Sequence, residues 1–553
     1  MASVTDHAHE KRPSVLKEWI FTTDHKRVGI LYLVGSIAAF LVAGLMAVGI
    51  RIEQFAPGES GLINYFVGDF AKNLPTGTAY NVALYFHGAA MILAFLIPGL
   101  TGFAANYLVP LMLGAPDVAF PRINALSLWL FWAGILVALL TFVMPDKPDI
   151  MWTGYPPYSV TTTANTAAYV FTVHLIGFSS ILGAVNFLVT IIYMRAPGMG
   201  WNQMNIFVWT TFAAFMIQIV FVPVLASAVT LLLFDKYLGT GFFDPTRGGD
   251  VLLYQNLFWF YSHPAVYVIF LPAVGLLFEI IATQAKNHVF NYKACVYGGI
   301  IGILVITGEV WIHHLYIAGM PDWLRIGMMI STLLISVPVG LLLISLWGTM
   351  YKGAITYNMS MWYAVACLFL ILVGGLTGIP LAMTSMTVHL SETSFVHAHF
   401  HFIMGLMATF AVFAAVYHWF PKMTGRSADN GLAKIAFILK VAGTQLTFWP
   451  LFIIGVRGMP RRYWDYSMFP EFEPYHHIAT YGAALIGIGV ILMVAGWVWS
   501  AFKGPLVGTN PWGSKSLEWT HAESPPGPGN FPKPVTVDNN WTPYNYNDWG
   551  DHR

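Results

Sequence analysis

Charged residues and cysteines are scarce in this chain. Only 10% of its 553 residues are Asp, Glu, Lys or Arg, whereas 57% are hydrophobic and 16% are aromatic. This composition is too apolar for a soluble globular protein of this length. The formal net charge of +1 gives no indication of a nucleic-acid partner. Cys295 and Cys367 lie in hydrophobic stretches, and two cysteines are too few for a disulfide framework or a thiolate metal site.

Hydrophobic runs long enough to cross a bilayer recur along the whole chain. A helix of about 20 apolar residues spans a hydrocarbon core of ~30 Å. We therefore predict an all-α fold, a polytopic membrane bundle of about twelve transmembrane helices. The expected spans centre on residues 28–50, 80–106, 124–145, 167–195, 204–234, 252–283, 293–316, 324–350, 361–386, 397–420, 434–456 and 477–502.

The chain divides into an N-terminal segment (1–27), a transmembrane domain (28–503) and an extended C-terminal tail (504–553). The first segment carries Lys11 and Arg12 and lacks the apolar stretch of a signal peptide. These cations predict a cytoplasmic N-terminus by the positive-inside rule. An even number of spans then returns the C-terminus to the same side. The tail is rich in Pro, Gly, Asn and Trp, which is typical of an irregular surface segment.

Six histidines lie in hydrophobic stretches, where ionisable side chains are costly and therefore usually functional. They are His87, His263, His313, His314, His399 and His401. Imidazole is the commonest side-chain ligand for metals and suits copper, iron and zinc. The set therefore indicates metals inside the membrane, and hence electron transfer.

The spacing of His399 and His401 predicts that one helix serves two cofactors. Residues two apart differ by about 200° around a helix, so the two rings point to opposite sides. Each could ligate a flat cofactor, and His87 on a distant helix could complete the coordination of one of them. The other cofactor would keep an open position for a small molecule. The chain has no Cys-x-x-Cys-His motif, so no haem is expected to be covalently attached.

The remaining three histidines predict a second kind of metal site. His313 and His314 are adjacent at an expected helix end, where the backbone can bend to bring both rings to one side. With His263 they would form a three-histidine site, which suits copper or non-haem iron. Tyr267 follows His263 by four residues and so lies on the same helical face. A phenol beside a metal can supply a proton and an electron together.

Several longer motifs give the chain a resemblance that covers nearly its whole length. They are Thr23-Asp-His-Lys-Arg27, Gly114-Ala-Pro-Asp-Val-Ala-Phe-Pro-Arg122, Phe242-Phe-Asp-Pro245, Leu253-Tyr-Gln255, Trp311-Ile-His-His314, Gly458-Met-Pro-Arg-Arg462 and Leu517-Glu-Trp519. On these motifs the chain resembles subunit I of the haem–copper oxygen reductases of the cytochrome c oxidase type. The motif Tyr261-Ser-His-Pro264 resembles that of one branch of the family.

The resemblance implies two haems and one copper. By this resemblance His87 and His401 ligate a low-spin haem, His399 ligates a high-spin haem, and His263, His313 and His314 ligate copper. Haem A is expected, although the sequence does not distinguish it from haems O and B. Tyr267 matches a tyrosine covalently joined to the first copper ligand in this family.

Three arginines are expected to serve the haems. Arg51 matches an arginine that contacts the low-spin haem, and Arg461 and Arg462 match residues that hold haem propionates. Arg461 and Arg462 fall in an outer loop, against the positive-inside rule, and a bound anion would account for their position.

The implied activity is reduction of O2 to water coupled to transmembrane proton translocation, in which Tyr267 gives a proton and an electron. The implied partners are oxidase subunits II and III, and cytochrome c or another donor such as a quinol. The implied location is a bacterial inner membrane, with both termini cytoplasmic. No nucleic acid is involved.

The resemblance also implies a proton path that begins at Asp117. The polar residues that match this path are Asn106, Asn124, Ser179, Ser180 and Asn186. The glutamate common in the family is replaced by Ala265, and Tyr261 and Ser262 are expected to take over its role. Such residues can order a chain of water molecules.

A second path of the family is altered, because its usual lysine and threonine are Leu342 and Val339. Glu309, expected in a buried helix, is either a substitute relay or a locally hydrogen-bonded carboxylate. The usual His-Asp magnesium pair is Ser391-Glu392, so Glu392 is a candidate ligand and binding of magnesium or calcium is left open. Glu53 matches a calcium or sodium ligand of some members.

Two other functions fit part of the pattern. A nitric-oxide reductase shares the six histidines but uses non-haem iron with nearby glutamates, and lacks the His-x-x-x-Tyr pair. Glu309 favours this alternative, whereas Tyr267 and Asp117 argue against it. A secondary transporter would also have about twelve helices, with discontinuous ones around a central site, but it would not require paired histidines.

Overall fold

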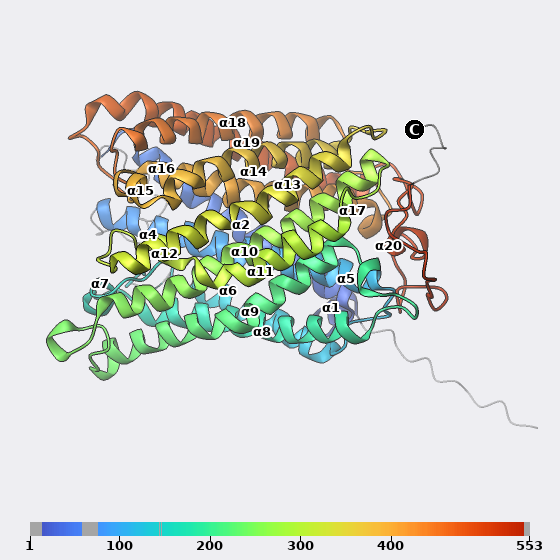
Figure 1. Ribbon diagram of the computed structural model, residues 1–553, viewed down its shortest axis with the longest axis horizontal. Coiled ribbons are helices and arrows are strands. Elements are labelled where there is room, and N and C mark those ends of the chain that lie inside the picture. The colour runs from blue at the N-terminus through green and yellow to red at the C-terminus, as the bar shows by residue number, and fades with distance from the viewer. Residues whose placement is uncertain (1–13, 58–75, 143, 145, 547–553) are drawn as a thin grey trace, which may run out of the picture.

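The described residues form a bundle of long helices that run side by side, as Figure 1 shows. The computed structural model describes residues 14–57, 76–142, 144 and 146–546. Lys11 and Arg12, which support the predicted topology, lie outside these residues. Within the described ranges no β-strand occurs, and only isolated bridges pair backbone segments.

Eleven helices of the described chain are long and apolar enough to cross a membrane. They are built from α2 (His25–Glu53); α4, η1, η2 and α5 (Thr76–Ala89, Ala90–Leu96, Pro98–Ala104, Ala105–Leu113); α6 (Pro121–Leu140); α8 (Thr166–Tyr193); α9 and η4 (Ile206–Leu233, Phe234–Leu238); α10 (Val251–Ala285); α12 and α13 (Asp322–Leu334, Ser336–Met350); α14 (Met359–Ala382); α16, η9 and α17 (Ser394–Phe400, His401–Leu406, Met407–Thr424); α18 (Gly431–Val456); and η10 and α19 (Pro470–Phe472, Glu473–Lys503).

The expected span at 293–316 is shorter than the others. Its apolar helix runs only over Ala294–Glu309 and is made of η6 (Ala294–Ile300), α11 (Ile301–Ile306) and η7 (Thr307–Glu309). The chain then tightens into the 3₁₀ turn η8 (Trp311–His314). The prediction of an all-α membrane bundle is confirmed, with this one span cut short. The remaining short helices are α1 (Val15–Ile20), η3 (Trp201–Gln203), α7 (Tyr158–Thr161), η5 (Pro245–Arg247), α15 (Thr384–Leu390) and α20 (Leu517–Thr520).

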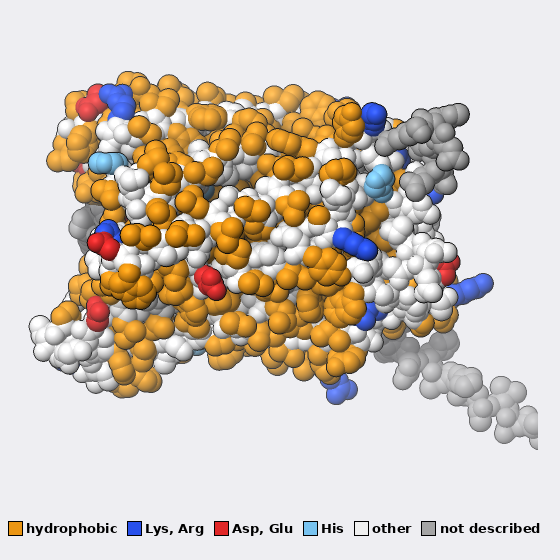
Figure 2. Space-filling view, viewed as in Figure 1, with side chains coloured by type: hydrophobic (Ala, Val, Ile, Leu, Met, Phe, Trp, Pro, Cys, Tyr) orange, Lys and Arg blue, Asp and Glu red, His pale blue; other side chains and the backbone are white. Residues whose placement is uncertain are grey.

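Helix α10 forms the centre of the bundle. In its most apolar stretch of 18 residues 94% of the residues are buried, compared with 28% in the same length of α19 at the periphery. Figure 2 shows the outer face covered by hydrophobic side chains, with charged side chains gathered mainly toward the two ends. An apolar belt between two charged ends matches the environment of a bilayer and its aqueous borders.

The C-terminal tail folds across one end of the bundle. Figure 1 places α20 and the tail at the same end as α1. Leu517 and Trp519 of α20 are buried, with 0% and 2% of their surfaces exposed. The Lys422 ammonium at the end of α17 donates to the backbone oxygens of Ala522 and Glu523, each at 3.0 Å. The tail therefore belongs to the packed structure of this end.

We expect Gly374→Ala to destabilise the protein and Gly375→Ala to be neutral or stabilising. A Cβ at Gly374 in α14 would lie 2.7 Å from the backbone nitrogen of Ile403, whereas nothing lies within 4 Å of one at Gly375. Overpacking costs about 1–3 kcal/mol. Alanine is favoured over glycine in a helix by about 1 kcal/mol. Thermal unfolding of the two purified variants measures the difference, and equal unfolding temperatures would contradict this packing.

Candidate metal centre and proton path

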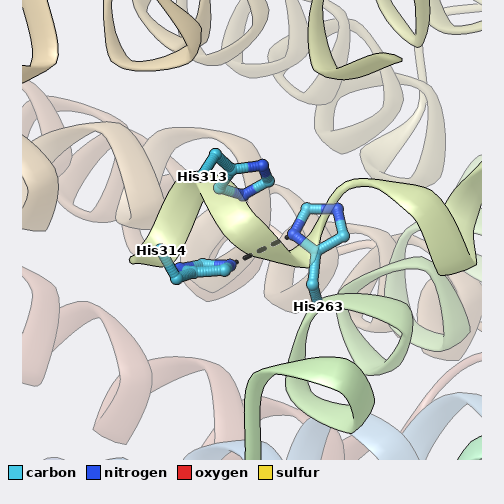
Figure 3. A group of neighbouring side chains, drawn as sticks. All are labelled: His263, His313 and His314. Atoms are coloured by element: carbon cyan, nitrogen blue, oxygen red, sulfur yellow. Dashed lines mark hydrogen bonds between the residues drawn. The ribbon is translucent and has the colours of Figure 1, made fainter. Parts of the chain in front are cut away.

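Three imidazoles converge beside the centre of the bundle. His263 comes from α10, and His313 and His314 come from η8, as Figure 3 shows. Their possible ligand atoms all lie within 4.8 Å of one another. Nδ1 of His263 lies 3.2 Å from Nε2 of His314. Among the described residues this is the one group of three or more His, Cys, Asp or Glu side chains with such geometry.

The 3₁₀ turn explains how adjacent histidines reach the same site. Its tighter winding changes the directions that neighbouring side chains have on an α-helix. Nδ1 of His313 lies 3.3 Å from the Thr332 hydroxyl of α12. The His314 ring stacks on Trp259, with ring centroids 3.7 Å apart and planes 8° from parallel. Both rings are thus fixed by neighbouring helices.

The three-histidine cluster fits a metal ion. Two imidazole nitrogens that face each other at 3.2 Å need a shared proton or cation between them. Three nitrogen ligands without a carboxylate suit copper. Nε2 of His263 is buried and has no hydrogen-bond partner in the structure, so this histidine has a second nitrogen available for chemistry.

His87 and His401 form a facing pair on separate helices. His87 lies near the end of α4, just before the π-helical turn η1, and His401 begins η9. Their ring centroids are 6.3 Å apart and their planes differ by 9°. Two imidazoles on opposite sides of one iron have about this separation, because two metal–nitrogen bonds of about 2 Å add to the half-widths of the rings. The pair fits the axial ligands of one haem.

In His87, His399 and His401 the Nδ1 atom lies within hydrogen-bond distance of an oxygen atom. Nδ1 of His87 lies 3.0 Å from the Ala43 carbonyl, and Nδ1 of His401 lies 2.7 Å from the His397 carbonyl. Nδ1 of His399 lies 3.2 Å from the Thr377 hydroxyl of α14. A hydrogen bond at one ring nitrogen fixes the tautomer and leaves the other nitrogen as a metal ligand. All three side chains therefore present Nε2.

His399 and His401 lie against different helices. His399 contacts α14, where a Cβ at Gly378 would come within 3.0 Å of its ring. His401 stacks on Phe448 of α18 at 4.4 Å and faces His87 of α4. This arrangement agrees with the opposite directions expected from the spacing. Which haem each histidine holds stays a prediction.

The three arginines lie toward the end opposite the tail. Arg51 at the end of α2 is buried and donates to the Gln54 side chain at 2.6 Å and to the His476 carbonyl at 2.9 Å. Burial lowers the pKa of Arg462 to about 10, and this guanidinium contacts the Met151 sulfur at 3.8 Å. A half-buried cation with so weak a contact fits an anionic group such as a haem propionate.

Glu392 binds an arginine in the structure. Its carboxylate makes a two-point contact with Arg461, with one distance of 2.8 Å from Nε. In the part of the chain that is described, Glu392 joins no cluster of potential metal ligands. The geometry makes Glu392 a partner of Arg461, and a magnesium ligand at this residue stays a prediction without structural support. Glu53 is buried at the end of α2.

The predicted proton path is partly assembled. The Asn124 amide donates to Asn106 Oδ1 at 2.6 Å, and Ser127 donates to the Asn124 carbonyl at 2.8 Å. Ser179 donates to the Ser127 carbonyl at 2.6 Å. The Tyr32 hydroxyl lies 3.0 Å from the Ser127 hydroxyl and 3.1 Å from that of Ser179. A continuous polar row therefore leads from Asn106 into the membrane.

Sequence reasoning missed Tyr32 and Ser127 in this row. The available signal was the position of each residue, because Tyr32 and Ser127 are hydroxyl side chains within the mostly apolar helices α2 and α6. Asn186 binds both backbone groups of Phe120, at 2.8 and 3.3 Å, and its part in the proton path stays a prediction. It thereby holds the loop that carries Asp117.

Ser180 and Tyr261 lie on a separate cavity farther along. This cavity of about 30 Å³ is also lined by His174 and by apolar side chains such as Val222. A water molecule needs about 10–15 Å³ and two or more polar partners, so the cavity has room for water. Tyr261 and the neighbouring Ser262 are themselves buried in α10, directly before His263.

In this chain the second proton path has no polar residue at the position of the family's usual lysine. Leu342 is 1% exposed and therefore part of the apolar core. Glu309 ends η7 with an exposed side chain. The expectation that this carboxylate is buried is wrong, because its side chain is exposed where the short span ends in a 3₁₀ turn. Its function as a relay stays a prediction.

Comparisons with known proteins agree with this geometry. Residues 27–485 match the family described as Cytochrome C and Quinol oxidase polypeptide I. Cytochrome c oxidase subunit 1 of Thermostichus vulcanus is 41% identical over 92% of this chain and 89% of the relative. The subunit of the same name from Cereibacter sphaeroides is 38% identical over 95% and 96%.

A relative and a solved structure extend the comparison. Heme-copper oxidase subunit I+III of Aeropyrum pernix is 38% identical over 93% of this chain and 61% of the longer relative. A cryo-EM structure of a heme-copper terminal oxidase dimer shares the fold, with a TM-score of 0.71 and 19% identity over 93% of this chain and 88% of that one. The chain therefore belongs to the cytochrome c and quinol oxidase polypeptide I family and is the catalytic subunit of a terminal oxidase.

Proposed function

We propose that this subunit reduces O2 to water at a high-spin haem and a copper ion, as part of a proton-translocating cytochrome c oxidase. The observation that carries the proposal is the cluster of His263, His313 and His314, whose ligand atoms lie within 4.8 Å of one another.

The residues fit two haems, for which haem A is proposed, and one copper. His87 and His401 would hold the low-spin haem, His399 the high-spin haem, and the three-histidine cluster the copper. When bound, these groups supply the electrons and the position at which oxygen is reduced. The chain would supply the Nε2 atoms of His87, His399 and His401 to hold the haems, because hydrogen bonds at Nδ1 fix these three rings.

Tyr267 is the proposed source of a proton and an electron at this site. Its ring centroid lies 5.0 Å from that of His263, one helical turn away. His263 directs Nδ1 toward His314 and leaves Nε2 without a partner. We propose a bond between Nε2 and the Tyr267 ring, which replaces one N–H and one C–H and releases two protons and two electrons to oxygen as the oxidant. The bond would hold the phenol beside the reacting oxygen.

Asp117 is the proposed point of proton uptake. Burial raises the pKa of this carboxyl, although nearby His25 and the Val118 amide act in the opposite direction. The row from Asn106 to Ser179 and the cavity at Ser180 and Tyr261 support a route through water molecules toward α10. A buried apolar residue such as Leu342 cannot relay a proton, because an unpaired charge there is costly.

The proposed assembly includes further oxidase subunits, among them a subunit II through which electrons enter and a subunit III. The donor would be cytochrome c, with a quinol as the alternative. A bacterial inner membrane with both termini on the cytoplasmic side is proposed, in keeping with the tail and α1 at one end of the bundle. Asp117 would then take up protons from the cytoplasm.

A nitric-oxide reductase is the less favoured alternative. It calls for a carboxylate near the non-haem metal, yet Glu309 is exposed and the cluster of the described residues contains histidines alone. Tyr267 packs on His263, as an oxygen reductase requires. A secondary transporter would leave the converging histidines without a function.

We expect His399→Ala and His401→Ala to affect different haems. His399→Ala should remove carbon monoxide binding and preserve the low-spin spectrum, because the two rings contact different helices. His401→Ala should alter the low-spin band. Reduced-minus-oxidised spectra with and without carbon monoxide measure both. The assignment is reversed if His401→Ala abolishes carbon monoxide binding and spares the low-spin band.

We expect Asp117→Asn to slow steady-state oxygen consumption by about tenfold or more, equivalent to about 1.4 kcal/mol in the barrier. Asparagine keeps the size of the side chain and removes the proton that it exchanges. Glu309→Gln is the matched control and should cause a smaller loss. Oxygen consumption and flash-induced proton uptake in vesicles are the measurements. Normal turnover in Asp117→Asn together with collapse in Glu309→Gln would show that the two paths are assigned the wrong way round.

A further inference from the structure

Asn530 of the C-terminal tail bridges two segments at the mouth of the proposed proton path. It is 1% exposed. Its Oδ1 accepts from the Lys26 ammonium at 2.8 Å and lies 3.0 Å from Nε2 of His25. Its Nδ2 donates to the Ala115 carbonyl at 2.8 Å, two residues before Asp117. One tail residue thus ties the start of α2 to the loop that carries Asp117.

Both ring nitrogens of His25 face oxygen atoms. Nδ1 lies 2.6 Å from the carbonyl of Asn106, the first polar residue of the path, and Nε2 lies 3.0 Å from Asn530 Oδ1. The bonds of Asn530 to Lys26 and Ala115 fix which end of its amide is the oxygen. Both neighbours of His25 are therefore acceptors, and a neutral imidazole can donate to only one of them. The two acceptors favour an imidazolium that donates from both nitrogens, whereas burial and the neighbouring Lys26 ammonium favour the neutral ring.

Charged groups of both signs surround His25. Lys26 pairs with Asp24 at 3.0 Å, on the same turn of α2. From the facing loop, Asp117 interacts favourably with His25, and this interaction works against the effect of burial on the pKa of Asp117. The charged groups that face His25 are therefore Lys26, Asp24 and Asp117. A proton held on His25 would lie between Asp117 and the backbone of Asn106.

We propose that Asn530 is a positioning residue for proton uptake: the docked tail holds His25 in its doubly donating form between Asp117 and Asn106. This inference rests on the proposed Asp117 path. Without Asn530, His25 would lose the acceptor of one N–H, Lys26 would lose a partner, and the loop at Ala115 would lose its tie to α2. Protons taken from solution would then reach Asn106 more slowly.

A second anchor of the same tail provides a matched control. The Tyr544 hydroxyl donates to Glu279 at 2.6 Å and accepts from the Ile206 amide at 2.7 Å. These partners belong to α10 and α9, and none of them contacts Asn530, His25 or Asp117. Tyr544→Phe therefore loosens the tail without touching the proposed uptake site.

The test uses the complete oxidase complex in vesicles and measures flash-induced proton uptake across a range of pH. Asn530→Ala should slow uptake by about threefold or more, the effect of losing a hydrogen bond of ordinary strength. The pH at which uptake declines should fall by about half a unit or more, because the acceptor that stabilises the charged imidazole is gone. Asn530→Asp keeps this acceptor and adds a negative charge, so it should move the decline to higher pH. Tyr544→Phe should change neither quantity, and haem spectra should be unchanged in all three.

The outcomes separate this inference from the proposed function. If Asp117→Asn leaves uptake normal in the same assay, the path itself is wrong and Asn530 has no part in it. If Asp117→Asn slows uptake while Asn530→Ala alters neither rate nor pH profile, the path stands and the function of Asn530 is overturned. Equal effects of Asn530→Ala and Tyr544→Phe would also overturn it, because they would show that general loosening of the tail slows uptake. If the Asn530→Ala complex fails to assemble, Asn530→Asp tests the inference instead. A decline of uptake at higher pH supports it, and a decline at unchanged or lower pH overturns it.

Discussion

The cost of leaving a polar atom unpaired in hydrocarbon governs how this bundle holds its histidines. Nδ1 of His87 and His401 lies beside helical carbonyl groups, and Nδ1 of His399 lies beside the Thr377 hydroxyl. Each bond leaves Nε2 as the free nitrogen and sets its direction. Helix packing thus determines where metals can bind, and close contacts such as that between Gly374 and Ile403 keep the packing in place.

The cost of unpaired polar atoms also explains why a proton route through this apolar bundle needs side chains that bond to one another. Asn106, Asn124, Ser127 and Ser179 form a row in which each side chain bonds to another member, and these bonds offset part of the cost of burying them. Within this row Asn124 Oδ1 is buried without a partner in the structure. The position of Leu342 offers no such partners and is filled with hydrocarbon. At the aqueous end the row meets charged residues, and there the C-terminal tail supplies Asn530 as the connecting group.

Much of this arrangement could be predicted from the sequence, because hydropathy and helical spacing are local properties. They predicted the long spans, the opposed directions of His399 and His401, and the meeting of His263 with His313 and His314. The short span that ends at Glu309 was not predicted, since a hydropathy window does not register where a helix tightens into a 3₁₀ turn. The contact of Asn530 with His25 joins residues 505 positions apart, and no local pattern indicates such a pairing.

The central claim is that six histidines hold two haems and one copper in this chain. Metal analysis of the purified oxidase, combined with a reduced-minus-oxidised spectrum, tests it most directly. The subunit I sites should contribute one low-spin haem, one high-spin haem that binds carbon monoxide, and one copper that is lost in His314→Ala. Haem accompanied by non-haem iron, with no copper at the three-histidine cluster, would contradict the account and favour a nitric-oxide reductase. A spectrum without haem bands would contradict it entirely.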